Sequence, residues 1–310
     1  EICLLGREPS ALEAARLSPL VDTVASSPEA LAGQRFTAVY NLNSHPEAAG
    51  LGPKLKYDQY YGPILIEGEL RLPPAQMFLM ALMRLGRRLG RFNLVDVWAS
   101  LVPEAEASST FWPGSGKVKK DRGHGPALIG LQLSCRNHLR RWPVENFVAL
   151  GRELAALGHS FTFVLLGSPE EKALAKKLRA LWGRNDLIDL VGGTSLSGLA
   201  EALEGLDLLV SADTVVMHLA AALKRPVLGL FFGPAWGPET GPYGVNHLIY
   251  QSLAHCAPCL ESCSCRQRLC RELPRPDIAA AAVGRLLAGQ EGADPWPAVL
   301  HDLPPGHRLW

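Results

Sequence analysis

Three polar residues stand where an apolar strand passes into an apolar helix, in the stretch "SADTVVMHLAAALKRP" at 211–226. Asp213 and Thr214 close the strand, and His218 follows one helical turn later, on the same face as Thr214. If Asp213 caps the helix, the amides of its first turn lie at the positive end of the helix dipole and suit a phosphate. The amides concerned are those of Thr214, Val215 and Val216. The structural alternative is a capped core helix with a hydrogen-bonded histidine.

A basic loop follows another apolar strand in "LQLSCRNHLRRWPVENF" at 131–147. The strand ends at Ser134, and a helix is expected to start near Pro143. An arginine guanidinium binds two phosphate oxygens at once, so this loop and the 211–226 helix start could hold a diphosphate together. In the alternative, the loop is solvated and its arginines pair with Glu145 or Glu170. The arginines are Arg136, Arg140 and Arg141.

Two adjacent glutamates open the helix predicted in "LLGSPEEKALA" at 165–175. Carboxylates in a first helical turn are favoured by the helix dipole without any ligand. The functional alternative is that Glu170, or Glu171 one place on, accepts hydrogen bonds from both hydroxyls of a ribose.

Five of the seven cysteines gather in "CAPCLESCSCRQRLC", with the spacing C-x2-C-x3-C-x-C-x4-C. A C-x2-C pair with two more thiolates nearby suits tetrahedral zinc or iron, and four thiolates would also satisfy an iron–sulfur cluster. Disulfides and a reduced, unbound cluster are the alternatives. The predicted structural metal takes four of the five candidates, and Cys256, Cys259 and Cys270 are favoured over Cys263 and Cys265.

The elements that must position these residues alternate in the C-terminal half. Short apolar runs, each typical of a buried strand, are separated by helical patterns, which predicts right-handed βαβ units and a doubly wound parallel sheet. The expected strands are 127–134, 161–167, 187–192, 207–213 and 226–232. The helix after Pro143 and a second one at 196–203 carry apolar stripes of helical period.

The N-terminal half has the same α/β character with weaker patterns. Strands are expected at 1–6, 21–27 and 36–43, with helices at 11–17 and 74–90, and the Gly-, Lys- and Pro-rich stretch 113–126 is a linker. We therefore expect one domain at 1–120, a second at 121–290, and a tail at 291–310 that packs back on the first domain.

Composition limits the classes of function and the cellular compartment that this chain can have. A net charge of +1 gives no general attraction to nucleic acid, and no apolar run approaches the roughly 18–20 residues of a membrane span. The thiol cluster is local, unlike a secreted disulfide scaffold, so the chain is expected to be intracellular. Its oligomeric state stays open.

Taken together, the ordered motifs over residues 127–290 resemble the heptosyltransferases, glycosyltransferase family 9. The stretches "RRWPVENFVALGREL", "LLGSPEEKALA", "DLVGGTSLSGLAEAL" and "SADTVVMHLAAALKRPVLGLFFGP" carry the resemblance. It implies a GT-B fold, with two Rossmann-like domains facing across a cleft. It also implies an ADP-heptose donor in the C-terminal domain and a lipopolysaccharide-core or other glycan acceptor in the N-terminal one. Transfer would proceed with inversion and without a required cofactor, in the cytoplasm or peripherally at the inner face of the bacterial inner membrane.

The resemblance also implies roles for single residues. Arg140 takes the place of a family lysine near the donor phosphates. Glu170 or Glu171 takes the place of the carboxylate that binds the ribose. Thr194 takes the place of a residue whose backbone contacts the adenine. Ser134 and Arg136 belong to the same donor loop. The family signature D-[ST]-G-x-x-H falls on Asp213, Thr214 and His218.

Two departures from the family pattern stand out. Val215 replaces the signature glycine, and the strand, glycine-rich turn and catalytic aspartate with which the family begins do not stand before "EICLLG". That segment either precedes Glu1 or has been lost. His45, beside Asn43 and Glu47, is the candidate base on the acceptor side. The alternative function is that of a catalytically impaired homologue that binds nucleotide sugars.

Overall fold

A seven-stranded parallel sheet with helices on both faces dominates the C-terminal part of the computed structural model. The structure describes residues 1–18, 20–74, 76–77, 80–81, 87, 93–102, 125–135, 137–259, 265–266, 269–272, 274–289 and 298–301. The chain divides into two units, Glu1–Pro113 and Gly114–Trp310. The division falls within the predicted linker.

In the C-terminal unit the strand order is β13-β12-β11-β10-β7-β8-β9, with every neighbouring pair parallel. Numbered within this unit, the order is 3-2-1-4-5-6-7, the doubly wound order of dinucleotide-binding folds. This confirms the predicted α/β fold class. The strands are β7 (Ala127–Gln132), β8 (Phe161–Leu166), β9 (Leu187–Asp189), β10 (Leu208–Ala212), β11 (Val227–Phe231), β12 (His247–Gln251) and β13 (Ala298–His301).

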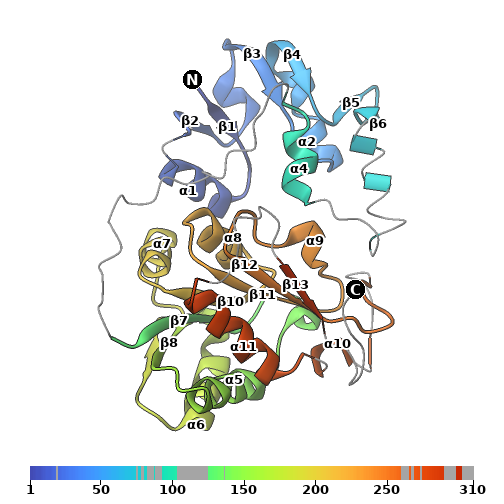
Figure 1. Ribbon diagram of the computed structural model, residues 1–310. Helices are drawn as coiled ribbons and strands as arrows, with labels where there is room; N and C mark the ends of the chain where they lie inside the picture. The colour runs from blue at the N-terminus through green and yellow to red at the C-terminus, as the bar shows by residue number, and fades with distance from the viewer. Residues whose placement is uncertain are drawn as a thin grey trace. The chain divides into compact units, whose positions relative to one another are not determined.

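Two groups of helices cover this sheet. Helices α5, α6 and α11 pack together on one face, and α7 and α8 pack together on the other (Figure 1). The bounds are α5 (Val144–Ala156), α6 (Lys172–Trp182), α7 (Leu196–Glu204), α8 (Val215–Ala222), α9 (Gly237–Thr240), α10 (Leu269–Glu272) and α11 (Pro276–Leu287). Because both faces are covered, the central strands are mostly apolar, and β10 and β11 are buried along their whole length.

One part of the predicted tail is described. Ala298–His301 form β13, which pairs with β12 and extends the C-terminal sheet. The packing of the tail on the N-terminal domain stays a prediction. An edge strand with open hydrogen-bonding groups attracts a further extended segment, which accounts for the pairing.

In the N-terminal unit the described strands form three separate pairs. β1–β2 and β3–β4 are parallel and β5–β6 is antiparallel, so the single doubly wound sheet expected here is not continuous among the described residues. The predicted helix at 11–17 is confirmed as α1, whereas most of the helix predicted at 74–90 lies outside the described residues. The bounds are β1 (Cys3–Leu5), α1 (Pro9–Leu17), β2 (Thr23–Ala25), β3 (Arg35–Tyr40), α2 (Pro46–Ala49), β4 (Lys56–Tyr61), β5 (Ile64–Ile66), β6 (Glu69–Arg71) and α4 (Leu94–Ala99).

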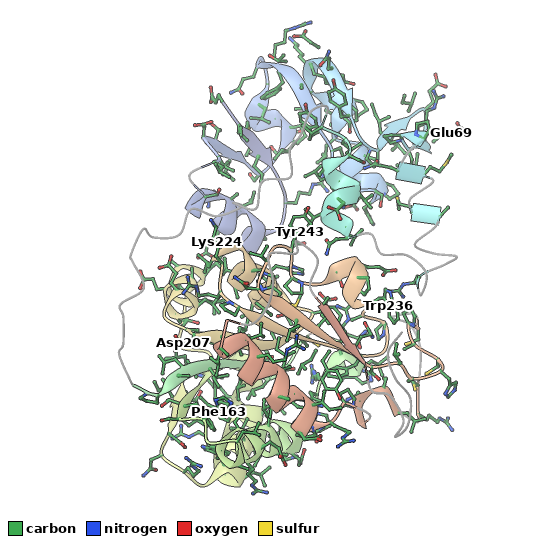
Figure 2. All side chains as sticks on the ribbon, in the orientation of Figure 1. Glu69, Phe163, Asp207, Lys224, Trp236 and Tyr243 are labelled. Carbon is green, nitrogen blue, oxygen red and sulfur yellow. The ribbon has the colours of Figure 1, made fainter. Side chains whose placement is uncertain are left out.

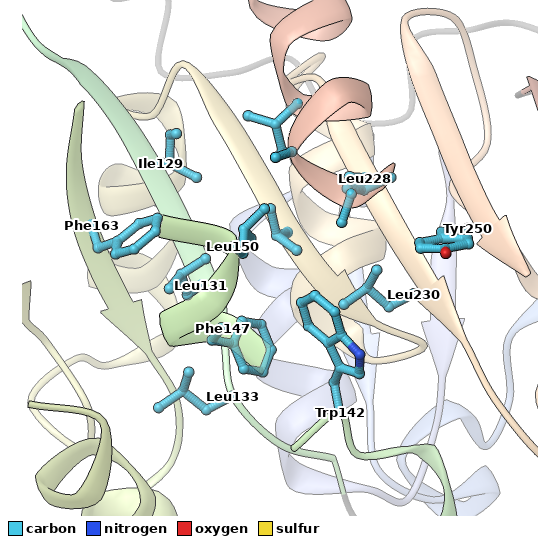
Figure 3. Packing of buried hydrophobic residues seen from close by; sticks show 14 of the residues in the cluster. Ile129, Leu131, Leu133, Trp142, Phe147, Leu150, Phe163, Leu228, Leu230 and Tyr250 are labelled. Atoms are coloured by element: carbon cyan, nitrogen blue, oxygen red, sulfur yellow. The ribbon is translucent and has the colours of Figure 1, made fainter. Parts of the chain in front are cut away.

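The core of the C-terminal unit lies between the sheet and the α5–α11 layer. Figure 3 shows Trp142 and Phe147 against the strand residues Leu131 and Leu230, all of them buried. The Trp142 and Phe147 rings meet edge to face, with centroids 5.0 Å apart. Trp142 therefore anchors the chain between β7 and α5 to the core, and this stretch carries the basic loop.

A buried histidine begins β12 and gives the fold a pH dependence. His247 is almost fully buried, and burial lowers its pKa to about 4. An unfolded histidine has a pKa of roughly 6.5, so between about pH 6.5 and pH 4 only the unfolded chain binds the proton. The stability that neutral His247 contributes is therefore complete above about pH 6.5 and is lost as the pH falls towards 4. Between pH 7 and pH 5 we expect the protein to lose about 2 kcal/mol more unfolding free energy than the His247→Gln variant. Urea titrations at the two pH values measure this.

The exposed residue His255 supplies the matched control, because His255→Gln should keep the pH dependence of the unaltered chain. An equal loss of stability in the unaltered chain and in His247→Gln would contradict the assignment.

Candidate functional site

A large cavity opens at the carboxyl edge of the C-terminal sheet, between β7 and β10. The chain continues from β7 to β8 on one side and from β10 to β11 on the other, so this is the topological switch point where open α/β sheets bind ligands. The cavity has a volume of about 1450 Å³, ample for a nucleotide sugar. Its walls come from the segments that follow β7, β8, β9 and β10.

Arg140 is held in this cavity by its neighbours in the chain. Leu139 and Trp142 are each 2% exposed, and the Trp142 indole N–H donates to the carbonyl of Pro274 at 3.3 Å. Arg140 Nη1 donates to Asp213 Oδ2 at 3.1 Å, and both side chains are largely buried. Glu145 pairs with Lys177 instead, so the alternative in which it neutralises the loop arginines is wrong for Arg140.

Asp213 has a different local role from the one expected. Thr214 is the N-cap residue of α8, so Asp213 stands one residue before the cap. Its Oδ2 accepts from Arg140 and from the Thr240 hydroxyl at 3.0 Å, and its Oδ1 lies 3.6 Å from His218 Nε2. Partners elsewhere in the chain bind this carboxylate in place of the expected cap.

The first turn of α8 forms part of the cavity wall. Thr214, Val215 and Val216 line the cavity, and the first amides of any helix lack acceptors within the helix. The Thr214 hydroxyl lies 3.3 Å from the Ser211 hydroxyl and does not cap the helix itself. With the guanidinium of Arg140 nearby, this end of the cavity suits an anion.

At the end of β8, a buried carboxylate forms a second polar corner. Glu171 accepts from Gln132 Nε2 at 3.1 and 3.2 Å and from the Ser168 amide at 2.8 Å. Gly167 leaves room for this carboxylate, because a Cβ at that position would lie 2.2 Å from Glu171 Oε2 and would displace it. Glu170, in contrast, is exposed, and a hydrogen bond from Ser168 lowers its pKa.

The remaining wall of the cavity is apolar and joins the end of β9 to α7. Leu174, Leu196 and Leu199 line it beside Thr194 and Ser195. Such a surface suits a planar aromatic base, with the backbone and hydroxyls of the 194–195 stretch available for polar contacts.

A cysteine also lines the cavity. Burial raises the pKa of Cys135 to about 11, although Arg140 and Arg141 act in the opposite direction. The thiol is therefore protonated at neutral pH, and a nucleophilic thiolate is not formed there.

The structure brings most of the predicted donor residues to this one cavity. Arg136 lies outside the described residues, and His218 reaches the site through Asp213, since it is not among the lining residues. Two participants were missed: Gln132, hidden in an apolar strand, and Thr240, which follows a stretch without a clear pattern. The predicted residues that line the cavity are Ser134, Arg140, Glu170, Thr194, Asp213, Thr214, Val215 and Val216.

His45 lies in the N-terminal unit. It is the N-cap residue of α2, and its Nδ1 accepts from the Glu47 amide at 3.4 Å. Helix capping explains the side chain locally, so its role as a base stays a prediction.

The cysteine cluster packs beside the loop after β11. The Cys259 amide donates to the Gly233 carbonyl at 3.2 Å, and burial, with Cys256 and Cys265 nearby, raises the pKa of Cys270. The described members of the cluster are Cys256, Cys259, Cys265 and Cys270, and Cys263 lies outside the described residues. Within the described part of the chain, no three potential ligands are placed to hold a metal ion, so the structure does not support the predicted zinc or iron site.

None of the helices in the described ranges combines the length and apolarity that a bilayer crossing needs.

Comparison with known proteins gives concordant matches. Lipopolysaccharide heptosyltransferase 1 of Salmonella typhimurium is 36% identical over 136 residues, which are 43% of this chain and 38% of that protein. Its counterpart from Pseudomonas aeruginosa is 34% identical over 122 residues, 39% of this chain and 33% of that protein. The matched part thus spans well under half the length of these curated relatives.

Solved structures show the same fold. A glycosyl transferase of family 9 from Veillonella parvula matches with a TM-score of 0.68 at 16% identity, covering 93% of this chain and 89% of that one. The E. coli ADP-heptose lps heptosyltransferase II matches with a TM-score of 0.60 at 16% identity, covering 93% and 90%.

The family model for glycosyltransferase family 9 (heptosyltransferase) matches residues 104–269, just over half of the chain. That stretch contains the basic loop, the Glu171 corner and the start of α8, and the chain belongs to glycosyltransferase family 9.

Proposed function

We propose that this protein acts as a heptosyltransferase, transferring heptose from an ADP-heptose donor to a lipopolysaccharide-core acceptor. One observation carries the proposal. Arg140 and the first turn of α8 line the same cavity, at the sheet edge where a nucleotide diphosphate binds in this fold. The names of the relatives, lipopolysaccharide heptosyltransferases, support the choice of sugar and acceptor.

The proposed donor pose follows the chemistry of the walls. The adenine lies against Leu174, Leu196 and Leu199, and the ribose hydroxyls donate to the buried Glu171 carboxylate. The diphosphate then reaches Arg140 and the α8 amides, which bind it through charge-assisted hydrogen bonds.

In the proposed reaction, an acceptor hydroxyl displaces ADP at the anomeric carbon with inversion. The transition state has oxocarbenium character, and negative charge grows on the departing diphosphate. Arg140 and the α8 amides are in place before the reaction, so they stabilise that charge without reorganisation. The proton of the acceptor hydroxyl passes to a base on the acceptor side, for which His45 is the candidate.

A second candidate is a protein that binds the nucleotide sugar without turning it over. Val215 favours it, because this side chain is 71% exposed at the cavity where the family signature has glycine. A β-branched side chain there narrows the approach of a phosphate to the backbone. The location at the inner face of the inner membrane and peripheral membrane contact remain predictions.

Calorimetric titration with ADP and ADP-heptose, with UDP as the comparison ligand, tests the proposal. We expect both adenine nucleotides to bind and UDP to bind at least about tenfold more weakly, since the apolar wall is shaped for a larger base. Transfer to a lipopolysaccharide inner-core acceptor, with the anomeric configuration of the product measured by NMR, then separates the two candidates. Binding without transfer supports the second, and no binding of any nucleotide overturns both.

A further inference from the structure

The short helix α9 contacts the donor cavity indirectly, through a hydrogen bond from Thr240 to the lining residue Asp213. It follows the loop after β11, and Trp236, labelled in Figure 2, comes directly before it. The Gly237 amide donates to Gln251 Oε1 at 2.8 Å, and Gln251 is fully buried in β12. This bond ties the first residue of α9 to the sheet.

The position of α9 is closely constrained. A Cβ at Gly237 would lie 2.4 Å from Ile249 Cγ2, and one at Gly241 would lie 2.5 Å from the Gly237 carbonyl oxygen. Only glycine fits at either end, because the turn lies directly on β12. The last residue of the turn, Thr240, is consequently held at one place relative to the sheet.

From this position Thr240 forms a hydrogen bond with Asp213. Its hydroxyl donates to Asp213 Oδ2 at 3.0 Å, and the same oxygen accepts from Arg140 Nη1 at 3.1 Å. One carboxylate oxygen therefore joins α9 to the basic loop after β7. The Asp213 side chain is only 12% exposed, so water competes weakly for these bonds.

The second oxygen of Asp213 faces a histidine. His218 Nε2 lies 3.6 Å from Oδ1, and this histidine is half-exposed. Without the Thr240 hydroxyl, rotation of the carboxylate about its broad terminal torsion would let Asp213 turn towards His218 and withdraw from Arg140.

We propose that Thr240 is a positioning residue of the donor site. By fixing Asp213, it holds the Arg140 guanidinium beside the first turn of α8, where the diphosphate arrives. A guanidinium has five N–H donors in a rigid fork, so pairing through Nη1 orients Arg140 without using up its capacity for phosphate. Thr240 is absent from the cavity lining, and its effect acts through Asp213 and Arg140. The inference rests on the proposed function for the identity of the ligand.

Calorimetry with ADP and with adenosine tests this role. Thr240→Val keeps the shape and removes the hydroxyl, and we expect it to weaken ADP binding about fivefold while leaving adenosine affinity unchanged. Thr240→Ser restores the donor and should bind ADP within about twofold of the unaltered chain. Added to Arg140→Ala, Thr240→Val should have no further effect, because the two residues act through one contact.

Three outcomes would overturn the inference. They are unchanged ADP affinity in Thr240→Val, equal weakening of ADP and adenosine, and failure of Thr240→Ser to restore binding. Thr240→Ala, measured beside the valine variant, separates loss of the hydroxyl from an effect of the added methyl group. If the unaltered chain binds no ADP, the proposed function fails and this inference fails with it. If the unaltered chain binds ADP and the variants do not differ from it, only this inference fails.

Discussion

Replacing Arg140 with alanine is expected to weaken ADP binding by about 100-fold and to leave adenosine binding almost unchanged. The variant loses a charge-assisted bond to the diphosphate. It also leaves the Asp213 carboxylate, which pairs with Arg140 at 3.1 Å in the unaltered chain, facing the phosphates without that neutralising partner. Both effects weaken binding of the diphosphate, and neither involves the nucleoside. Titrations with ADP and with adenosine therefore separate the phosphate contribution from the rest.

Two further variants sharpen this test. Arg140→Lys keeps the charge but loses the forked N–H donors of the guanidinium. Its affinity for ADP should be about tenfold lower than that of the unaltered chain. Arg152→Ala removes an exposed arginine from α5, outside the cavity, and should bind as the unaltered chain does. Equal losses for ADP and adenosine in Arg140→Ala would mean that the residue supports the fold and not the phosphate.

The second large effect is expected at Glu171. Its carboxylate accepts from Gln132 and from the Ser168 amide, so Glu171→Ala removes an acceptor from both, and Gln132 Nε2 keeps only its bond to the Ser134 carbonyl. We expect a loss of about 2–3 kcal/mol of unfolding free energy and about tenfold weaker ADP binding. Thermal unfolding and calorimetry measure the two losses separately.

Glu170→Ala is the matched control, since it removes an exposed carboxylate one residue away. We expect it to leave stability almost unchanged. Comparison of ADP with 2′-deoxy-ADP then locates the ribose. The unaltered chain and Glu170→Ala should prefer ADP, and Glu171→Ala should not. A preference lost in Glu170→Ala instead would assign the ribose to the exposed carboxylate.

The tests with Arg140→Ala and Glu171→Ala also bear on the alternative function. A protein that binds nucleotide sugars without transfer needs the same phosphate and ribose contacts as an enzyme. Both variants should therefore weaken binding whichever candidate is correct, and only the transfer assay distinguishes the candidates.

Much of the C-terminal unit was predictable from its residues alone. Parallel strands covered on both faces appear in a sequence as short, continuous apolar runs, and β7, β8, β10 and β11 lie within the predicted ranges. β9 is shorter than expected and ends at Asp189, because it is an edge strand with one neighbour. β12 was missed, since its segment "HLIYQ" begins with a histidine that looks polar and is buried.

The sequence by itself determined which residue types gather at the cavity. Ser134, Thr194 and Thr214 stand at or just after the ends of three predicted strands, and the carboxyl ends of parallel strands meet at one sheet edge, so these residues had to lie near one another. The tertiary structure alone decided how they are used. Asp213 could cap its own helix locally, but it is bound instead by Arg140, 73 residues away in the chain, and by Thr240. Glu171 and not Glu170 turns inward because Gln132, 39 residues away, offers it an amide donor. Local propensity sets the elements, whereas the choice between neighbouring carboxylates depends on buried partners that only the assembled fold brings within hydrogen-bond distance.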